Sequence, residues 1–330
     1  MQPLFLLIDI DNTLYEYSET GFNDEMHDRI FSFAEKNLGI STAQAEQLSR
    51  KYFMNYGLSL YGYVKEYKVN PKEYSDYVHH CSYDKLKYNE PLVAMLQSMQ
   101  YRPEGAVAGD EDSVTGGVDH LYYFTNANRS HARRVLDPQG LRPIFTRPRH
   151  AGSPIKEYHR LDDEAGFEDQ VEWLGFSYED QWRLTQPDFA NKPMRRAYEA
   201  IYRAIEDQIA EETALLQDIG NAAGASASSP SAQLVHSRRT HLHPRNVVMV
   251  DDSLINLDAP LELGWSAVWY AHDNLTLPTD PAVNACAPLY AAAIASGRLE
   301  VIHHILELKS AVQRIREANM KASADGEKGC

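Results

Sequence analysis

The chain has 330 residues, of which 43% are hydrophobic and 24% are charged, and this balance is typical of a globular protein with a substantial core. Its formal net charge of −15 argues against a nucleic-acid polymer as a partner, because phosphate backbones attract clustered Lys and Arg. The three cysteines, Cys81, Cys286 and Cys330, are widely spaced and odd in number, so they indicate neither a disulfide framework nor a CxxC metal site.

The first element is an apolar run from Leu4 to Ile8 that ends in the sequence Asp9-Ile10-Asp11-Asn12-Thr13. This pattern predicts a buried parallel strand that delivers two carboxylates to the carboxyl edge of a sheet, where open α/β sheets bind their ligands. A divalent cation would offset the repulsion between the two acids. The alternative is that both acids only end the strand and start a turn.

The next segment, from Phe22 to Ser82, has helical periodicity, with Gly39 and Gly57 near helix ends. Several helices stand between the first and second strands, whereas a crossover needs only one. We therefore expect a helical insertion beside the strand edge that carries Asp9; the alternative is a set of helices that only cover the core. The segment is rich in large side chains that either stack on a base or, more commonly, pack together: Met54, Tyr56, Tyr61, Tyr63 and Tyr67.

A second predicted strand, Leu121 to Phe124, ends in Thr125-Asn126-Ala127-Asn128, and a helical segment follows from Ser130 to Leu136. A hydroxyl, an amide and free backbone N–H groups at a strand-to-helix junction suit a phosphate group.

Two later segments also end in polar groups. Asn191-Lys192-Pro193 precedes a helical pattern from Met194 to Ile209, and Pro193 at the first helical position would place Lys192 at the start of that helix. The apolar run from Val247 to Val250 ends in Asp251-Asp252-Ser253, with Asn256 shortly after. This run predicts another buried strand that finishes in carboxylates.

Three polar inserts interrupt the predicted core, at residues 103–119, 147–189 and 220–245. The middle insert contains Trp173 and Trp182 and is expected to fold onto the rim of the site, whereas the Ala/Ser/Gly tract at 220–231 predicts a loop. His236, His241 and His243 follow that tract and are interpreted as a solvated loop in preference to a zinc site. Ala267 to Tyr270 predicts a further strand. Leu299 to Ala318 predicts a C-terminal helix that packs on the core, with a dimer contact as the alternative.

The four polar strand and helix ends, in this order, resemble the motifs of the haloacid dehalogenase (HAD) superfamily of phosphohydrolases. The matching residues are Asp9, Asp11 and Thr13; Thr125 and Asn126; Lys192; and Asp251, Asp252 and Asn256. The pyrimidine 5′-nucleotidase branch has similar sequences at the segments DIDNTLY, NYGL, FTNAN, NKPMRRAYEAIY and VDDSLINL. This similarity is interrupted at the inserts.

The resemblance implies an α/β fold with a doubly wound, mainly parallel sheet, a HAD-like Rossmannoid core, and an inserted helical cap. Residues 1–20 and 89–298 would form the core, residues 21–88 the cap, and residues 299–330 a C-terminal helix and tail.

The resemblance also implies a role for each matched residue. Asp9 would be the nucleophile and Asp11 the general acid and base. Mg²⁺ would be held by Asp9, the backbone carbonyl of Asp11, and Asp252. Thr125, the Asn126 backbone and Lys192 would bind the substrate phosphate, and Asp251, Asn256 and Thr13 would orient ligands or water.

The leading hypothesis is a Mg²⁺-dependent phosphomonoesterase that hydrolyses nucleoside 5′-monophosphates, in particular UMP and CMP, through an aspartyl-phosphate. Asp11 favours phosphoryl transfer over dehalogenation. The alternatives are a phosphatase for another small phosphomonoester, such as a sugar phosphate or a lysophospholipid, a phosphomutase, and a non-catalytic interaction protein. We expect a small phosphorylated substrate, no membrane partner and a cytoplasmic location, because no apolar stretch reaches membrane-spanning length and the N-terminus lacks a signal peptide. The sequence leaves the oligomeric state open.

Overall fold

Parallel strands form the central sheet of the protein. The structure, a computed structural model, describes residues 4–100, 118, 120–148, 171–222 and 242–327. Within these residues six strands pair in the order β5-β2-β1-β6-β7-β8, and every pair is parallel. Their bounds are β1 Phe5–Ile8, β2 His120–Phe124, β5 Gly175–Phe176, β6 Val247–Asp251, β7 Ser266–Tyr270 and β8 Leu299–Ile302. A separate antiparallel pair joins β3 (Thr146–Pro148) to β4 (Val171–Trp173).

The first strand, β1, lies at the point where the order of the strands reverses. In β1, Leu7 lies opposite Tyr122 of β2 on one side and opposite Met249 of β6 on the other. The chain extends the sheet from β1 through β2 to β5, and then returns to the other side of β1 and continues through β6, β7 and β8. The carboxyl ends of β1, β2 and β6 therefore meet at a topological switch point, where open α/β sheets bind ligands.

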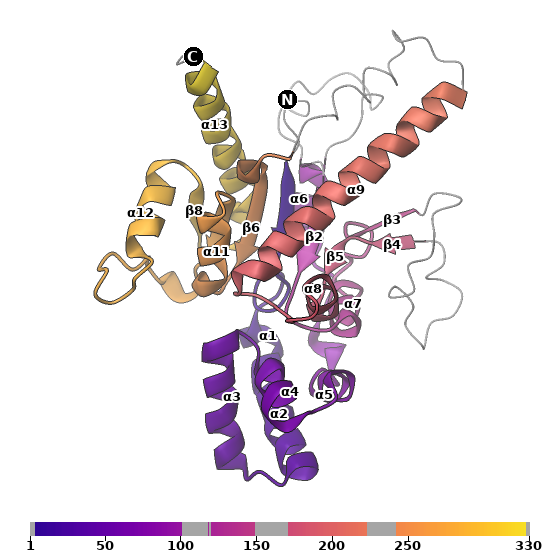
Figure 1. The fold of residues 1–330 in the computed structure, drawn as a ribbon, viewed down its shortest axis with the longest axis vertical. Helices are drawn as coiled ribbons and strands as arrows, with labels where there is room; N and C mark the ends of the chain where they lie inside the picture. The colour runs from indigo at the N-terminus through magenta and orange to yellow at the C-terminus, as the bar shows by residue number, and fades with distance from the viewer. Residues whose placement is uncertain (1–3, 101–117, 119, 149–170, 223–241, 328–330) are drawn as a thin grey trace.

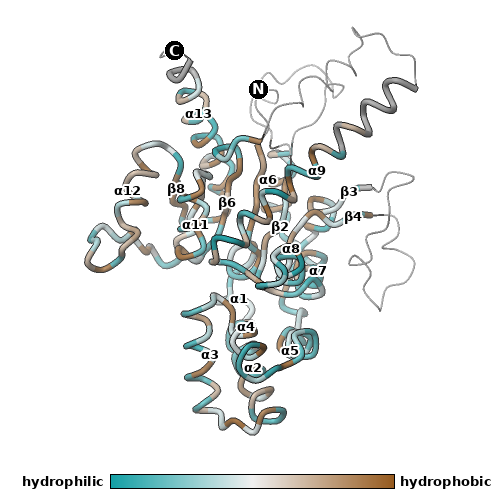
Figure 2. Tube along the Cα trace, in the orientation of Figure 1, coloured by the Kyte–Doolittle hydropathy of each residue, from teal (hydrophilic) through white to brown (hydrophobic). Residues whose placement is uncertain are grey.

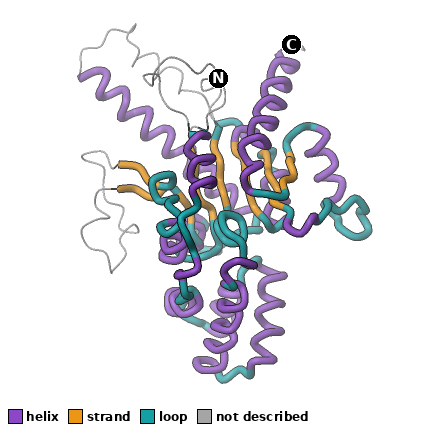
Figure 3. The backbone as a smooth tube through the Cα atoms, turned by 180° about the vertical axis from the view of Figure 1, so that it is seen from behind, coloured by secondary structure: helices purple, strands orange, loops and turns teal. Residues whose placement is uncertain are grey.

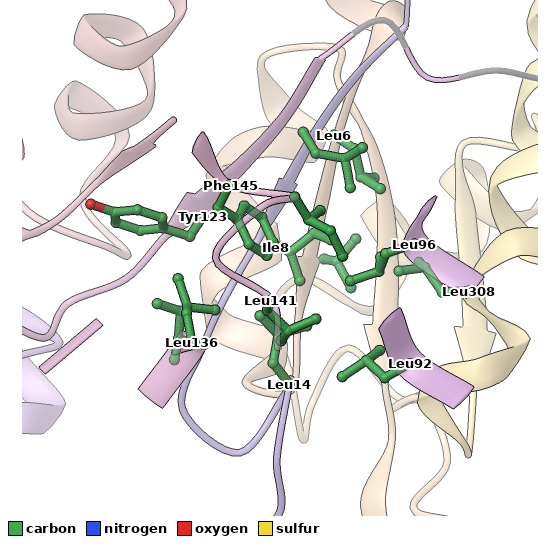
Figure 4. Close-up of a cluster of buried hydrophobic side chains, with 14 of the residues drawn as sticks. Leu6, Ile8, Leu14, Leu92, Leu96, Tyr123, Leu136, Leu141, Phe145 and Leu308 are labelled. Carbon is green, nitrogen blue, oxygen red and sulfur yellow. The ribbon is translucent and has the colours of Figure 1, made fainter. Parts of the chain in front are cut away.

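Helices cover both faces of the sheet. Leu6 and Ile8 of β1 point to one face and pack with α6 (Glu90–Met99), α7 (Arg129–Leu136) and α13 (Leu308–Glu327); Figure 4 shows this cluster. Phe5 and Leu7 point to the other face, which α9 (Arg195–Ala222), α11 (Asp258–Glu262) and α12 (Ala287–Ala295) cover. The central strands are correspondingly hydrophobic along their length in Figure 2. This arrangement confirms the predicted doubly wound α/β fold.

A group of helices between β1 and β2 lies beyond the carboxyl end of β1, at one end of the molecule (Figures 1 and 3). These helices are α1 Tyr17–Thr20, α2 Phe22–Leu38, α3 Thr42–Tyr56, α4 Ser59–Tyr67 and α5 Pro71–Val78, and we call them the cap. The cap has a hydrophobic cluster of its own that includes Tyr52, Tyr63 and Tyr74. The rings of Tyr56 and Tyr61 also lie against each other, with centroids 4.8 Å apart, so these cap aromatics pack together.

The middle insert supplies the link between the cap and the core. Its described part forms β4, β5 and α8 (Tyr178–Leu184), and Tyr178 and Trp182 of α8 belong to the hydrophobic cluster of the cap. On its other side α8 contacts α7, where Asp180 forms an ion pair with Arg129 at 2.8 Å. Within this insert, α8 therefore packs between the cap and α7.

Two predicted helix boundaries are wrong. The helix predicted from Leu299 begins at Leu308, because Leu299 and Ile302 are buried in β8, which extends the sheet beside β7. The helix predicted from Met194 to Ile209 runs instead from Arg195 to Ala222 and includes the start of the tract predicted as a loop. Pro193, expected at the first helical position, instead precedes the helix.

Short 3-10 helices complete the described structure: η1 Tyr83–Lys85, η4 Pro244–Asn246, η5 Leu254–Leu257, η6 His272–Asn274 and η7 Ile305–Glu307. Most of the inserts at 103–119 and 220–245, including His236 and His241, lie outside the described residues, as do residues 149–170. Among the helices that the structure describes, none combines the length and the apolar character needed to cross a membrane.

The buried ion pair between α7 and α8 leads to a stability prediction. Replacing Asp180 with Asn removes the charge that Arg129 faces at a site where both side chains are less than a tenth exposed. We expect Asp180→Asn to lower the free energy of unfolding by about 3 kcal/mol, because a buried guanidinium loses its hydrogen-bonded carboxylate while Glu179 still acts on its charge. The exposed ion pair between Asp188 and Arg196 provides the control, and Asp188→Asn should cost less than about 1 kcal/mol. Urea unfolding measures both; equal losses would contradict the prediction.

Candidate active site

Three acidic side chains meet where β1 and β6 end. Asp9 directly follows β1, and its backbone N–H donates to the carbonyl of Val250 at 2.9 Å, which fixes it beside β6. Asp251 is the last residue of β6, and Asp252 follows it. Asp9 and Asp251 are buried. One carboxylate oxygen from each of the three acids lies within 4.8 Å of the other two.

Lys192 holds two of these acids together. Its Nζ donates to Oδ1 of Asp9 at 2.7 Å and to Oδ2 of Asp251 at 2.8 Å, and its side chain is only 1% exposed. Burial disfavours the charged ammonium, but the two carboxylates outweigh burial and raise the pKa of Lys192. Burial raises the pKa of Asp9 well above its usual range, while Lys192 opposes that shift. Lys192 is therefore a charged group inside a site from which water is largely excluded.

Further side chains orient the acidic cluster. Asn12 donates from Nδ2 to Oδ2 of Asp252 at 2.7 Å. The backbone N–H of Ser253 and Nδ2 of Asn256 each donate to Oδ1 of Asp251 at 2.9 Å. Burial first, and then the nearby charge of Asp251, raise the pKa of Asp252 to about 7.

The carboxylate cluster offers the kind of ligand atoms that Mg²⁺ binds. Mg²⁺ prefers oxygen ligands and is commonly held by one or two carboxylates. Asp9 and Asp252 offer such oxygens at close range, while Asp251 has one oxygen bonded to Lys192 and the other to Ser253 and Asn256. The residues fit a divalent cation, with Asp9 and Asp252 as the carboxylates that retain free oxygens for it.

Asp11 has different neighbours. Its Oδ1 is 2.7 Å from Nε2 of His131 and accepts a hydrogen bond from the hydroxyl of Tyr15 at 2.6 Å, and its Oδ2 accepts one from Thr125 at 3.3 Å. Burial by itself would raise the pKa of Asp11, but the His131 ring and the two hydrogen bonds to Oδ1 outweigh burial and lower it. His131 is fully buried, and its Nδ1 lies 2.8 Å from the hydroxyl of Tyr83. A hydrogen-bonded row of side chains thus leads from Asp11 into the core.

The structure brings Thr125 to this site and turns the Asn126 side chain away from the acids. The hydroxyl of Thr125 accepts from the backbone N–H of Ala127 at 2.9 Å and donates to Asp11. The Asn126 amide donates to the backbone carbonyls of Lys192, at 2.9 Å, and Gly57, at 3.2 Å. Thr13 is buried in the turn after Asp11, and its hydroxyl has no hydrogen-bond partner within the described residues. Eight of the nine predicted site residues thus meet at one end of the sheet, through hydrogen bonds or as members of the carboxylate cluster. Thr13 is the exception.

Several residues of the site were not predicted from the sequence. Gln181 of α8 is fully buried; its Nε2 donates to the carbonyl of Thr125 at 2.8 Å, and its Oε1 accepts from the backbone N–H of Lys192 at 2.9 Å. His131 and Tyr15 bind Asp11 as described above. Asn12 and Tyr15 stand inside the first motif, so their position was available as a signal, whereas nothing in the sequence around Gln181 distinguishes it.

Comparisons with known proteins give one partial sequence match and distant structural matches. The chain is 29% identical over 142 residues to Phosphate metabolism protein 8 of Saccharomyces cerevisiae, a match that covers 42% of this chain and 40% of that relative's length. YfnB of Bacillus subtilis, called a HAD-hydrolase and bound to magnesium, is 13% identical with a TM-score of 0.42, over 94% of this chain and 99% of that one. L-2-haloacid dehalogenase of Xanthobacter autotrophicus is 10% identical with a TM-score of 0.38, over the same shares of the two chains. No family model matches the chain.

The raised pKa of Asp252 predicts how stability depends on pH when no divalent cation is present. An unfolded Asp has a pKa near 3.9, whereas Asp252 in the folded protein has a pKa of about 7, so the folded state binds the proton more tightly. Holding the ionised Asp252 in the folded protein costs free energy. This cost is absent below about pH 4 and complete above about pH 7, so the free energy of unfolding should fall across this interval by roughly 2–4 kcal/mol.

This pH dependence is measured by urea unfolding in the presence of a chelator, for the natural protein and for Asp252→Asn. The Asn variant carries no charge at this position, so its free energy of unfolding should fall less steeply between pH 4 and pH 7. Two curves with the same slope would show that Asp252 does not titrate in this range.

Proposed function

We propose that the protein is a Mg²⁺-dependent phosphomonoesterase that hydrolyses nucleoside 5′-monophosphates, with UMP and CMP as preferred substrates, through an aspartyl-phosphate on Asp9. One observation carries this proposal. A buried ammonium, Lys192 Nζ, bridges Asp9 and Asp251 at 2.7 and 2.8 Å, next to Asp252 and the hydrogen-bonded pair of Asp11 and Thr125. A carboxylate nucleophile, a fixed positive charge and a second carboxylate for proton transfer are the groups that phosphoryl transfer to an Asp requires.

In the first half of the proposed reaction, a carboxylate oxygen of Asp9 forms a bond to phosphorus while the bond from phosphorus to the ester oxygen breaks. Asp11 donates a proton to the departing alcohol, which leaves as the nucleoside. Because His131 and Tyr15 lower the pKa of Asp11 in the free site, this step requires the negative charge of the bound phosphate to raise that pKa. Lys192, Thr125 and the backbone N–H of Asn126 bind the other phosphate oxygens and stabilise the charge that develops on them.

In the second half, Asp11 accepts a proton from water as the water oxygen attacks phosphorus, and the bond between Asp9 and phosphorus breaks. Asp9 is regenerated and inorganic phosphate is released. The contact of His131 with Asp11 at 2.7 Å holds the Asp11 carboxyl in one orientation through both halves. Mg²⁺, which Asp9, the backbone carbonyl of Asp11, and Asp252 would hold, would supply the positive charge that lets an anionic phosphate approach several carboxylates.

The substrate class rests on the similarity of the motifs to pyrimidine 5′-nucleotidases. The matched relative is named for phosphate metabolism, in keeping with a phosphate-releasing reaction. Sugar phosphates, lysophospholipids and phosphomutase substrates would use the same acids and the same lysine, so the choice among them depends on contacts outside the catalytic cluster. A panel of phosphomonoesters decides between them.

The first test of this function is phosphate release from that panel with Mg²⁺ present. Asp9→Asn keeps the size of the side chain and removes the nucleophilic carboxylate, so turnover should fall on the order of 10⁴-fold or more. The exposed Asp188 provides the matched control, and Asp188→Asn should leave turnover unchanged. Failure of the natural protein to release phosphate from any ester would reject the proposal, and turnover confined to sugar phosphates or lipids would reject the nucleotide.

The proposed metal site predicts a stabilisation that does not depend on turnover. At a Mg²⁺ concentration about 100 times its dissociation constant, binding to the folded state alone should raise the free energy of unfolding by about 2.7 kcal/mol. Asp252→Asn removes one carboxylate of the cluster, so its unfolding should respond much less to Mg²⁺. Denaturant titrations with Mg²⁺ and with a chelator measure this difference. An equal response of the two proteins would place the ion elsewhere.

A further inference from the structure

The backbone of Lys192 is held by side chains and not by secondary structure. Lys192 lies between α8 and α9, and its N–H donates to Oε1 of Gln181 at 2.9 Å. Its carbonyl accepts two hydrogen bonds, from Nδ2 of Asn126 at 2.9 Å and from Nδ2 of Asn191 at 2.7 Å. Buried backbone groups need partners, and here three amide side chains provide them. The position of the lysine therefore depends on the position of these amides.

Two of these amides also bind the cap. Nδ2 of Asn126 donates to the carbonyl of Gly57 at 3.2 Å, and Nδ2 of Asn191 donates to the carbonyl of Tyr56 at 2.9 Å. A side-chain amide nitrogen carries two hydrogens, so each nitrogen can join the Lys192 carbonyl to one cap carbonyl. We call Asn126 and Asn191 the amide clasp. Its four hydrogen bonds connect the end of α3 directly to the backbone of Lys192.

Gly57 lies directly against the backbone of Lys192 and the ring of Pro193. It ends α3 with a φ of 70°, in the left-handed region, and its N–H donates to the carbonyl of Phe53 at 2.7 Å. A Cβ atom at this position would overlap both the ring of Pro193 and the carbonyl oxygen of Lys192. The turn that contains Tyr56 and Gly57 thus packs directly on Lys192 and Pro193. A side chain at position 57 would push this turn away from Lys192 and Pro193.

We propose that the Tyr56–Gly57 turn and the amide clasp form a positioning device, in which docking of this cap turn on Lys192 and Pro193 places the lysine ammonium between Asp9 and Asp251. The inference rests on the proposed function for its kinetic consequence. The position of the cap turn and the position of the lysine are then coupled. A displacement of about 1 Å in a catalytic group can reduce turnover about 100-fold, so a small shift of the turn has a large effect.

A pair of glycines in the cap provides a matched test. Gly39 ends α2 with a φ of 67°, so Gly39→Ala has the same backbone strain as Gly57→Ala, but a Cβ on Gly39 meets nothing within 4 Å. We expect Gly57→Ala to lower kcat about 10- to 100-fold relative to Gly39→Ala, with a smaller change in KM. Gly39→Ala should remain within a few-fold of the natural protein. Comparable melting temperatures of the two variants would show that both fold.

Hydrogen exchange of the Lys192 amide gives a second readout that needs no turnover. Displacement of the turn weakens the bonds that hold the Lys192 backbone, so its amide should exchange at least tenfold faster in Gly57→Ala than in Gly39→Ala. The same two measurements apply to Asn191→Asp, which replaces a donor to two carbonyls with an acceptor. Its control is Asn70→Asp, where only the side-chain oxygen is used, as an acceptor at the start of α5.

Slower turnover and faster exchange in Gly57→Ala and Asn191→Asp, with both controls unchanged, would support the device. Equal exchange rates and equal kcat in each variant and its control would overturn it. If the natural protein releases no phosphate from any ester, the proposed function fails, and the exchange comparison by itself still decides whether the turn positions the lysine.

Discussion

The bridge that Lys192 makes between Asp9 and Asp251 is the interaction on which the site depends. Two carboxylates this close in a buried place repel each other, and burial adds a desolvation cost for each charge. The ammonium at 2.7 and 2.8 Å opposes both effects, and its own charge is retained because two carboxylates surround it. The ends of β1 and β6 can therefore lie side by side with their acids joined through one lysine, although burial still raises the pKa of Asp9.

The fold makes this meeting possible through the order of its strands. Because β1 lies between β2 and β6, three chain segments that are far apart in sequence end at the same edge, and the cap is inserted directly after the first of them. Lys192 reaches the edge from an irregular segment, so its backbone needs partners that a strand or helix would otherwise supply. Gln181, Asn126 and Asn191 supply them, and each also binds a second element. The backbone of Lys192, α8 and the end of α3 consequently share one hydrogen-bond network.

The site is built from segments that are distant in sequence, and this determines which of its residues could be predicted. The strands at Phe5–Ile8 and Val247–Asp251, and the acids that end them, were predicted because an apolar run followed by Asp is a local pattern. Leu299–Ile302 was predicted as helix because short apolar runs fit either periodicity, and only pairing with β7 decides between them. Gln181 and His131 were missed because their partners, Lys192 and Asp11, are distant in sequence and adjacent only after folding. The limits of the cap and the individual catalytic roles remain predictions.

The charges of the site also explain why its acids differ from one another. Lys192 brings one positive charge to Asp9 and Asp251, whereas Asp252 accepts a hydrogen bond from a neutral amide, that of Asn12. Asp252 responds with a pKa of about 7, whereas Asp11, a short distance away, has its pKa lowered by His131 and Tyr15. A divalent cation at the cluster would act on the first acid far more than on the second. The fold thus separates a carboxylate set that favours a cation from a carboxylate whose charge is already satisfied by neighbouring side chains.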